Sequence, residues 1–210
     1  MEYPKIETAF KRDEDFKIDS TKLKRPEYDL VKSWQWTEKI DGMNIRVCWD
    51  GIGNFTILGR TDKANIPSDL AGFINGCIDL AGIDKFKEVF PLQSAIIYGE
   101  GYGVGIQKGG AYSKTKAFAV FDILIDDKYW LNWKDTYEIA HKLGFSTVPF
   151  LGIHDLKHAI DWTKEGFFST LAYHTTGAII AAEGVVGRTL EPLFDGYDNR
   201  LIIKLKTKDF

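Results

Sequence analysis

Strict alternation of apolar and polar residues between positions 43 and 49 is the feature that most restricts how this chain can fold. Four apolar residues alternate there with three others, namely Met43, Ile45, Val47 and Trp49 with Asn44, Arg46 and Cys48. Because successive side chains of a β-strand point to opposite faces, this spacing predicts a strand with one buried face. Asn44 and Arg46 are then expected together on the other face. The run from Gly51 to Asn54 predicts the turn that follows.

Further extended segments are spread along the chain without a regular β-α-β alternation. They are expected within residues 34–58 and at 94–98, 116–126, 147–151, 179–186 and 201–206, with a glycine-rich loop at 99–110. In the last of these segments the period of two places Lys204 and Lys206 on one face and Ile203 and Leu205 on the other. Two ammonium groups are therefore expected on the same surface.

Helices are predicted between these strands from apolar residues at helical spacing and from capping residues. The first is capped by Ser68 and ended by Gly82, and a short one follows up to Phe90. A third runs from an Asn132 cap to Leu143 and ends at Gly144, with Trp133, Tyr137 and Ala140 facing inward, and two short helices lie within residues 155–173. Helices inserted between mostly antiparallel strands predict an α+β fold in which helices flank the sheets.

Composition places the chain among ordinary globular proteins. With 210 residues, 44% of them hydrophobic, and no internal repeat or linker, a single domain over residues 1–210 is expected. Neither a membrane-spanning apolar run nor a secretory leader is evident, so a cytoplasmic protein without a membrane partner is expected. Cys48 and Cys77 are too few for a disulfide framework and are expected to be reduced. The net charge of −3 argues against a general basic coat, so any surface that binds nucleic acid must be local.

The strongest candidate for covalent chemistry is Lys39, which ends a predicted strand and is followed by Asp41 and Gly42. An ammonium has no lone pair, so the amine must lose its proton before it can attack, and burial or neighbouring cations favour that loss. Lys204, Lys206 and Arg60 are the candidate cations. Alternatively, the four residues from Lys39 to Gly42 form an ordinary surface hairpin.

Five short segments extend this interpretation. In chain order they are Lys39-Ile40-Asp41-Gly42, Gly59-Arg60-Thr61, Tyr98-Gly99-Glu100, Glu183-Gly184-Val185-Val186 and Lys204-Leu205-Lys206. Each is a weak signal alone. Their order and rough spacing resemble the motifs of the lysyl-nucleotidyltransferase superfamily of ATP-dependent DNA ligases, RNA ligases and mRNA capping enzymes. The resemblance covers nearly the whole chain.

The resemblance implies catalytic roles for four residues. Lys39 is implied to attack the α-phosphate of ATP and to carry AMP, while Lys204 and Lys206 contact that phosphate. Asp41 is implied either to tune or orient Lys39 or to serve only as a turn residue.

Further residues are implied to bind the nucleotide or its metal. Arg60 is expected to contact the ribose or a phosphate, and Glu100 to bind the ribose hydroxyls. Glu183 is expected to hold a divalent ion, Mg²⁺ or Mn²⁺, and Glu38 also belongs to the expected nucleotide-binding set.

Asn44, five residues after Lys39, resembles the phage RNA ligase 2 branch, because DNA ligases and capping enzymes usually carry Arg there. Residues 99–108 and 116–122 also resemble that branch, in which an aromatic ring at the position of Phe118 stacks on adenine. Strand alternation leaves open whether Phe118 or Phe121 takes that place. Arg46 departs from the pattern and its role is open.

The function implied is therefore ATP-dependent RNA ligation through a lysyl-AMP intermediate, in which AMP passes to a 5′-phosphate end and a 3′-hydroxyl displaces it. The implied architecture is a single nucleotidyltransferase (adenylation) domain with an ATP-grasp-like ligase core and no C-terminal OB domain, which leaves room for a partner protein. RNA ends are the expected substrate, with nicked duplex or DNA as alternatives. A DNA ligase, a guanylyltransferase and a non-catalytic nucleotide-binding or nucleic-acid-binding module are the competing functions.

Three other features are set aside. His154 and His158 have the spacing of a helical zinc pair, but an exposed helix start explains them better. The glycine-rich loop from Gly99 to Gly110 lacks the Gly-Lys-Ser/Thr ending of a P-loop, and its Lys108 is instead a candidate contact to substrate phosphate. The tryptophans at 34, 36 and 49 are expected on a half-buried core face rather than stacked on bases.

Overall fold

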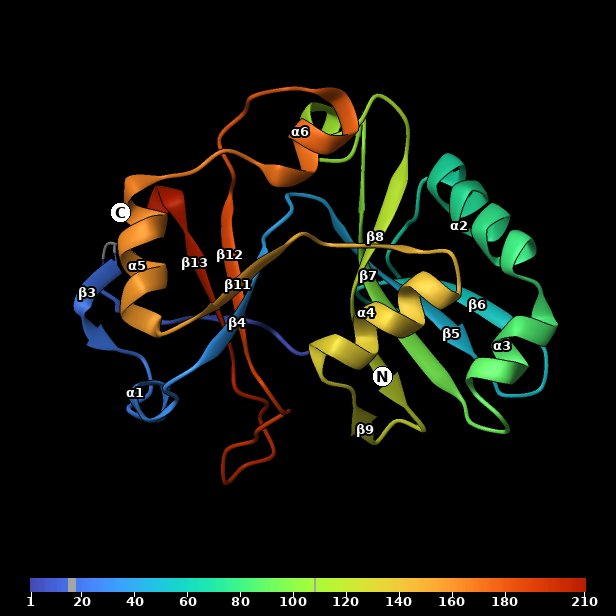
Figure 1. The fold of residues 1–210 in the computed structure, drawn as a ribbon, viewed down its shortest axis with the longest axis horizontal. Coiled ribbons are helices and arrows are strands. Elements are labelled where there is room, and N and C mark those ends of the chain that lie inside the picture. The colour runs from blue at the N-terminus through green and yellow to red at the C-terminus, as the bar shows by residue number, and fades with distance from the viewer. Residues whose placement is uncertain (15–17, 108) are drawn as a thin grey trace. The chain divides into compact units, whose positions relative to one another are not determined.

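A computed structural model describes residues 1–14, 18–107 and 109–210. The chain folds into two compact units, each with its own sheet (Figure 1). Unit 1 comprises residues 1–3 and 41–148, and unit 2 comprises residues 4–40 and 149–210. The expected single domain over residues 1–210 stays a prediction.

Unit 1 is built on a mostly antiparallel sheet with the strand order β10-β8-β7-β5-β6, in which β9 also pairs with β8. Its strands are β5 (Met43–Trp49), β6 (Phe55–Gly59), β7 (Ala95–Tyr102), β8 (Ala117–Ile125), β9 (Tyr129–Trp130) and β10 (Ser146–Thr147). Only the β8–β10 pair among these is parallel. The α+β class, with mostly antiparallel sheets, is confirmed.

Helices cover one face of the unit 1 sheet. They are α2 (Ser68–Ala81), α3 (Ile83–Val89) and α4 (Trp133–Lys142), and a 3-10 turn, η1, spans Gly109–Ala111. Ile45, Val47 and Trp49 of β5 are at most 1% exposed and share a core with Leu70 and Phe86 of the helices. Since burial of a large apolar side chain contributes roughly 1.5–3 kcal/mol, this alternating face anchors the unit.

Three expectations for unit 1 were wrong in detail. Helix α2 begins at Ser68, and no side-chain cap hydrogen bond precedes it, because Pro67 occupies the capping position. Tyr137 is 45% exposed rather than inward, since the narrow apolar stripe of α4 is centred on Trp133 and Ala140. Strand β7 continues through residues 99–102, which were expected in a loop, because β5 and β8 pair with it on both sides.

Unit 2 contains a sheet with the order β1-β13-β12-β4-β11 and a separate pair, β2-β3. The strands are β1 (Glu7–Thr8), β2 (Phe10–Arg12), β3 (Ile18–Leu23), β4 (Trp34–Glu38), β11 (Phe150–His154), β12 (Gly184–Thr189) and β13 (Ile202–Lys206). The helical segments are α1 (Glu27–Leu30), α5 (Leu156–Glu165), α6 (Thr170–Thr176) and the 3-10 turn η2 (Thr207–Asp209). Trp34 and Trp36 lie in its core, as expected, and they are fully rather than half buried.

Two strand predictions in the second half of the chain were wrong. The segment expected as one strand at 147–151 is divided between β10 and β11, which belong to different sheets. Pro149 separates them, since it lacks the N–H that a continuous ladder needs. The strand expected at 179–186 begins only at Gly184, whose φ of +148° and close approach to the Leu205 carbonyl admit no side chain.

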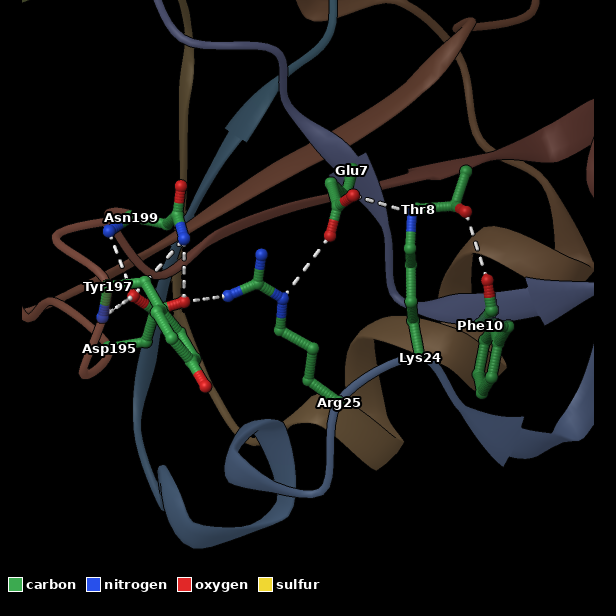
Figure 2. Close-up of polar contacts among 8 residues, drawn as sticks. All are labelled: Glu7, Thr8, Phe10, Lys24, Arg25, Asp195, Tyr197 and Asn199. Carbon is green, nitrogen blue, oxygen red and sulfur yellow. Dashed lines mark hydrogen bonds and ion pairs between the residues drawn. The ribbon is translucent and has the colours of Figure 1, made fainter.

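A network of ion pairs fastens the N-terminal part of unit 2 to the loop between β12 and β13 (Figure 2). Glu7 accepts from Lys24 at 2.5 Å and from Arg25 at 3.3 Å, and Arg25 also pairs with Asp195. Asp195 in turn accepts the backbone N–H groups of Tyr197 and Asn199 at 2.8 and 2.9 Å.

No helix among the described residues is long and apolar enough to cross a bilayer.

The caps of α2 and α4 give a direct test of this description. Asn132 accepts a hydrogen bond from the Asp135 N–H at 2.9 Å, whereas Ser68 makes no cap bond. We expect Asn132→Ala to lower the free energy of unfolding by about 1 kcal/mol and Ser68→Ala to change it by less than about 0.5 kcal/mol. Urea unfolding followed by circular dichroism measures both. Equal losses in the two variants would contradict the capping difference.

Candidate active site

Lys39 follows directly after β4 and is held at both its backbone and its side chain. Its N–H donates to the Gly184 carbonyl at 2.9 Å, which continues the β4–β12 ladder by one bond. Its Nζ donates to Oε2 of Glu183 at 2.5 Å, and the side chain is 21% exposed. The amine predicted as the nucleophile therefore has a fixed position within unit 2.

Glu183 joins two lysines. Its Oε1 lies 2.7 Å from Nζ of Lys206, while its Oε2 contacts Lys39. Burial raises the pKa of this carboxyl, but the two ammonium groups more than offset that effect and leave the pKa below its usual value. The carboxylate form is thereby stabilised.

Lys204 lies on the same face of β13 as Lys206, as the alternation predicted, while Ile203 and Leu205 are fully buried on the other face. Burial of its ammonium, together with the positive charges of Lys206 and Lys39, lowers the pKa of Lys204 to about 8. The structure therefore brings together Lys39, Glu183, Lys204 and Lys206, which we name the lysine cluster.

Glu38 points away from this cluster, because it precedes Lys39 on the strand. It is 1% exposed, and its carboxylate accepts from the Ser169 hydroxyl and from the Leu171 N–H, the latter at 3.0 Å. Burial raises the pKa of this carboxyl. Glu38 thus holds the first turn of α6, and its expected contact with the nucleotide stays a prediction.

In unit 1, Asn44 of β5 lies directly opposite Glu100 of β7 on one face of the sheet. Glu100 Oε1 accepts the N–H of Gly42 at 3.1 Å and so fixes the turn after Asp41. A Cβ at Gly42 would lie 2.3 Å from the Gly101 carbonyl oxygen, so this position admits only glycine. The Oδ1 atom of Asn44 is buried and has no hydrogen-bond donor among the described residues.

Arg46, whose role the sequence left open, anchors the end of β6. It is 2% exposed, and its Nε donates to the Gly59 carbonyl at 2.8 Å. Its Nη2 donates to Asp62 at 2.7 Å, so the guanidinium binds on both sides of the exposed Arg60. It also donates to the Met1 carbonyl at 3.4 Å. The sequence indicated only that Arg46 shares a strand face with Asn44, and it did not predict that Arg46 binds the backbone of Gly59.

The rings at 118 and 121 lie on opposite faces of β8. Phe118, 2% exposed, belongs to the core under the helices and packs against Phe145. A register shift opposite Tyr98 and Gly99 leaves Phe121 as the extra residue in β8. Phe121 contacts Tyr3, which contacts Tyr98, so it lies on the sheet face that carries Asn44 and Glu100. This geometry favours Phe121 over Phe118 as a ring on that face.

Few of the described side chains could coordinate a divalent ion. No group of three or more His, Cys, Asp and Glu residues able to hold a metal occurs in the described ranges. Glu183 offers hard carboxylate oxygens beside the lysine cluster, which suits Mg²⁺ or Mn²⁺ held mainly by substrate phosphates. His154 and His158 instead stack on each other with ring centroids 4.2 Å apart. Lys108 lies outside the described residues.

Removal of the Arg46 guanidinium tests its anchoring role. We expect Arg46→Met to lower the free energy of unfolding by about 1–3 kcal/mol, because the Gly59 carbonyl loses its donor in a buried place. Asp62→Ala is the matched control and should cost less than about 1 kcal/mol, since that side chain is 76% exposed and Arg46 keeps its hydrogen bond to the Gly59 carbonyl. Urea unfolding at neutral pH compares the two; an Arg46→Met variant as stable as the wild type would refute the assignment.

Lys204 should make folding depend on pH. Its ordinary pKa of 10.5 falls to about 8 in the folded chain, so at pH 7 both states are protonated and the folded state carries the full cost of the buried charge. Between about pH 8 and 10.5 the folded state loses that proton first, and stability from this group rises. We therefore expect Lys204→Met to stabilise the protein by about 1 kcal/mol at pH 7 after allowance for solvent screening. The gain should shrink as pH rises towards 9.5 in parallel thermal melts, and a pH-independent gain would contradict it.

Comparison with known proteins supports the sequence resemblance. The family model described as RNA ligase matches residues 32–206, and no curated protein sequence matches the chain. Similar solved structures include a Naegleria gruberi RNA ligase mutant with ATP and Mn, with a TM-score of 0.67 and 16% identity over 99% of this chain and 58% of that one. Naegleria gruberi RNA ligase with PPi has a TM-score of 0.65 and 16% identity over 98% of this chain and 62% of that one.

These structural likenesses show a shared fold, and the chain spans about three fifths of the length of the structures it matches. The closer likeness to the phage branch stays a prediction. Because the family model covers most of the sequence, the chain belongs to the RNA ligase family.

Proposed function

We propose that this chain catalyses ATP-dependent RNA ligation and that Lys39 carries AMP as a covalent lysyl-AMP intermediate. The observation that carries the proposal is the lysine cluster, in which Nζ of Lys39 lies 2.5 Å from a carboxylate that Lys206 also binds at 2.7 Å. Three amines around one carboxylate form a site suited to a polyanionic substrate. Family membership supplies the reaction class.

In the first step the uncharged amine of Lys39 attacks the α-phosphorus of ATP. The N–P bond forms, the P–O bond to the β-phosphate breaks, and pyrophosphate leaves with the bonding electrons. Lys39 must release both its proton and its ion pair with Glu183 before attack, since an ammonium has no lone pair. Lys204 and Lys206 would then stabilise the negative charge on the α-phosphate, which is the main demand of phosphoryl transfer.

Residues of unit 1 would bind the nucleoside and its phosphates. Glu100 would accept hydrogen bonds from the ribose hydroxyls, and Arg60 would contact the ribose or a phosphate. Asn44 fits a role in recognition, because its buried Oδ1 atom has no donor among the described residues and a ligand N–H or O–H could supply one. Phe121 is the ring we propose for adenine stacking in place of Phe118, from its position on the same sheet face as Glu100.

Glu183 would hold the divalent ion, directly or through water, and the ion would supply charge neutralisation at the phosphates. One of the similar solved structures is a Naegleria gruberi RNA ligase mutant with ATP and Mn together, which supports a nucleotide and a divalent ion as the pair to test here. Asp41, two residues after Lys39 in the sequence, would tune or orient that lysine.

In the later steps AMP would pass to a 5′-phosphate end, and a 3′-hydroxyl would displace it to seal the strand. RNA is the proposed substrate, with a DNA ligase and a non-catalytic binding module as the competing functions. Nicked duplexes of RNA, DNA and mixed composition, offered in parallel, would separate the first two. A cytoplasmic location and a partner protein that helps to bind nucleic acid remain part of the proposal.

The covalent step has a direct test. Purified protein incubated with ATP and Mg²⁺ or Mn²⁺ should gain one AMP by intact mass, and Lys39→Ala should abolish the adduct because it removes the attacking nitrogen. The variant should stay folded, since this side chain is partly exposed and contributes little core volume.

Lys134→Ala is the control, because that lysine is 81% exposed on α4 of unit 1 and should be adenylated like the wild type. Sealing assays on the same samples test turnover. A wild type that gains no AMP under any metal or pH, or an adduct that persists in Lys39→Ala, would overturn the proposal in favour of the binding module.

A further inference from the structure

Unit 2 exposes three large apolar side chains on the segment that leads into Glu183. Phe168 is 68% exposed, Tyr173 60% and Ile179 69%. Phe168 precedes α6, Tyr173 lies within it and Ile179 follows it (Figure 1). We name the two rings, Phe168 and Tyr173, together with Ile179 the aromatic surface. Exposed apolar side chains that form one contiguous patch mark binding surfaces more often than those scattered singly.

Backbone pairing gives this surface a fixed form. Phe168 and Ala181 form an antiparallel bridge, flanked by hydrogen bonds from Ser169 N–H to the Ile180 carbonyl at 2.8 Å and from Ala182 N–H to the Phe167 carbonyl at 2.9 Å. Residues 179 and 181 are exposed and residue 182 is buried, as in a strand whose side chains alternate. Ile179, Ala181 and Glu183 therefore share a side, and Phe168 lies across from Ala181.

The same segment is tied to Lys39 through buried contacts. Glu38 holds the start of α6 through Ser169 and Leu171, and Lys39 donates to the carbonyl of Gly184. Thr207 hydroxyl bonds to the Ala182 and Glu183 carbonyls, at 3.1 and 3.2 Å, join the segment to the end of β13. The aromatic surface and the lysine cluster therefore belong to one framework within unit 2.

A single-stranded nucleic acid stacks its bases on aromatic side chains while its phosphates meet cations. The segment that carries the two rings leads directly into Glu183 of the lysine cluster. A chain with a net charge of −3 does not present a general basic coat, so a surface on it that binds RNA must be local. We propose that the aromatic surface, with Phe168 and Tyr173 as its stacking rings, binds unpaired bases of the RNA end that reacts at the lysine cluster. This inference rests on the proposed function and adds the place where RNA is recognised.

Binding of a fluorescent, 5′-phosphorylated single-stranded RNA to the full chain tests the inference by anisotropy. We expect Phe168→Ala and Tyr173→Ala each to raise Kd by about five-fold or more, since stacking contributes at least about that factor per base. The ratio of variant to wild-type Kd should stay nearly constant as salt rises, because stacking releases no counterions. Phe168→Trp retains a ring and should bind like the wild type.

Tyr197→Ala is the matched control, since that ring is 88% exposed in the same unit but lies in the loop between β12 and β13. It should leave Kd unchanged. Formation of the AMP adduct from ATP should proceed at the wild-type rate in every one of these variants, and thermal melts should agree with the wild type.

Each departure from this pattern has a definite meaning. Unchanged RNA affinity in Phe168→Ala and Tyr173→Ala, with normal AMP transfer to Lys39, would overturn the surface and leave the proposed function intact. Loss of the AMP adduct together with RNA affinity would also overturn it, by assigning the rings a structural role. A wild type that binds RNA through these rings without gaining AMP would support the surface and refute the proposed function. A dimer that dissociates in the variants while RNA affinity holds would assign the surface to a second copy of the chain.

Discussion

The antiparallel pairing of β12 with β4 on one side and with β13 on the other is the constraint on which the candidate site of unit 2 depends. Val185 lies opposite Glu38 and also opposite Leu205, so the three strands reach the same end of the sheet in one register. Lys39, Glu183 and Lys206, which are far apart in the sequence, meet there. A slip of one residue in the β12–β13 ladder would turn the lysines of β13 into the core and the apolar residues outward. The fully buried Ile203 and Leu205 therefore hold the geometry of the lysine cluster indirectly.

Charge compensation explains why so many ionic groups can gather at that end. A partly buried carboxylate with one lysine would keep a costly unsatisfied oxygen, whereas Glu183 binds one ammonium through each oxygen. The arrangement also has one cation more than this carboxylate can pair, and burial together with repulsion from Lys206 and Lys39 lowers the pKa of Lys204. A bound polyphosphate would relieve that repulsion. The cluster is thus arranged for a ligand more negative than the protein itself provides.

The sequence predicted those features that depend on local periodicity or on a motif. Alternation identified β5 and the face of β13, the Asn132 cap identified the start of α4, and the short motifs identified the lysine cluster. It failed where the outcome depended on neighbours in space. No local pattern shows that residues 99–102 are held between two strands, or that Pro149 divides a segment between two sheets. The register shift that separates Phe118 from Phe121 is also invisible in the sequence, because it arises from pairing with β7.

Residues close together on one strand have different structural roles. The side chains of the neighbours Glu38 and Lys39 point in opposite directions. The Glu38 carboxylate accepts the Leu171 N–H in the interior and so fixes α6, whereas the Lys39 amine donates to Glu183. Asn44 and Arg46 likewise share a face, yet Arg46 satisfies the backbone around Arg60 while Asn44 keeps a buried acceptor without a donor among the described residues. An unsatisfied buried acceptor costs roughly 1–3 kcal/mol, and most such atoms in folded proteins are paired. We propose that a donor arriving with the nucleotide satisfies the buried oxygen of Asn44.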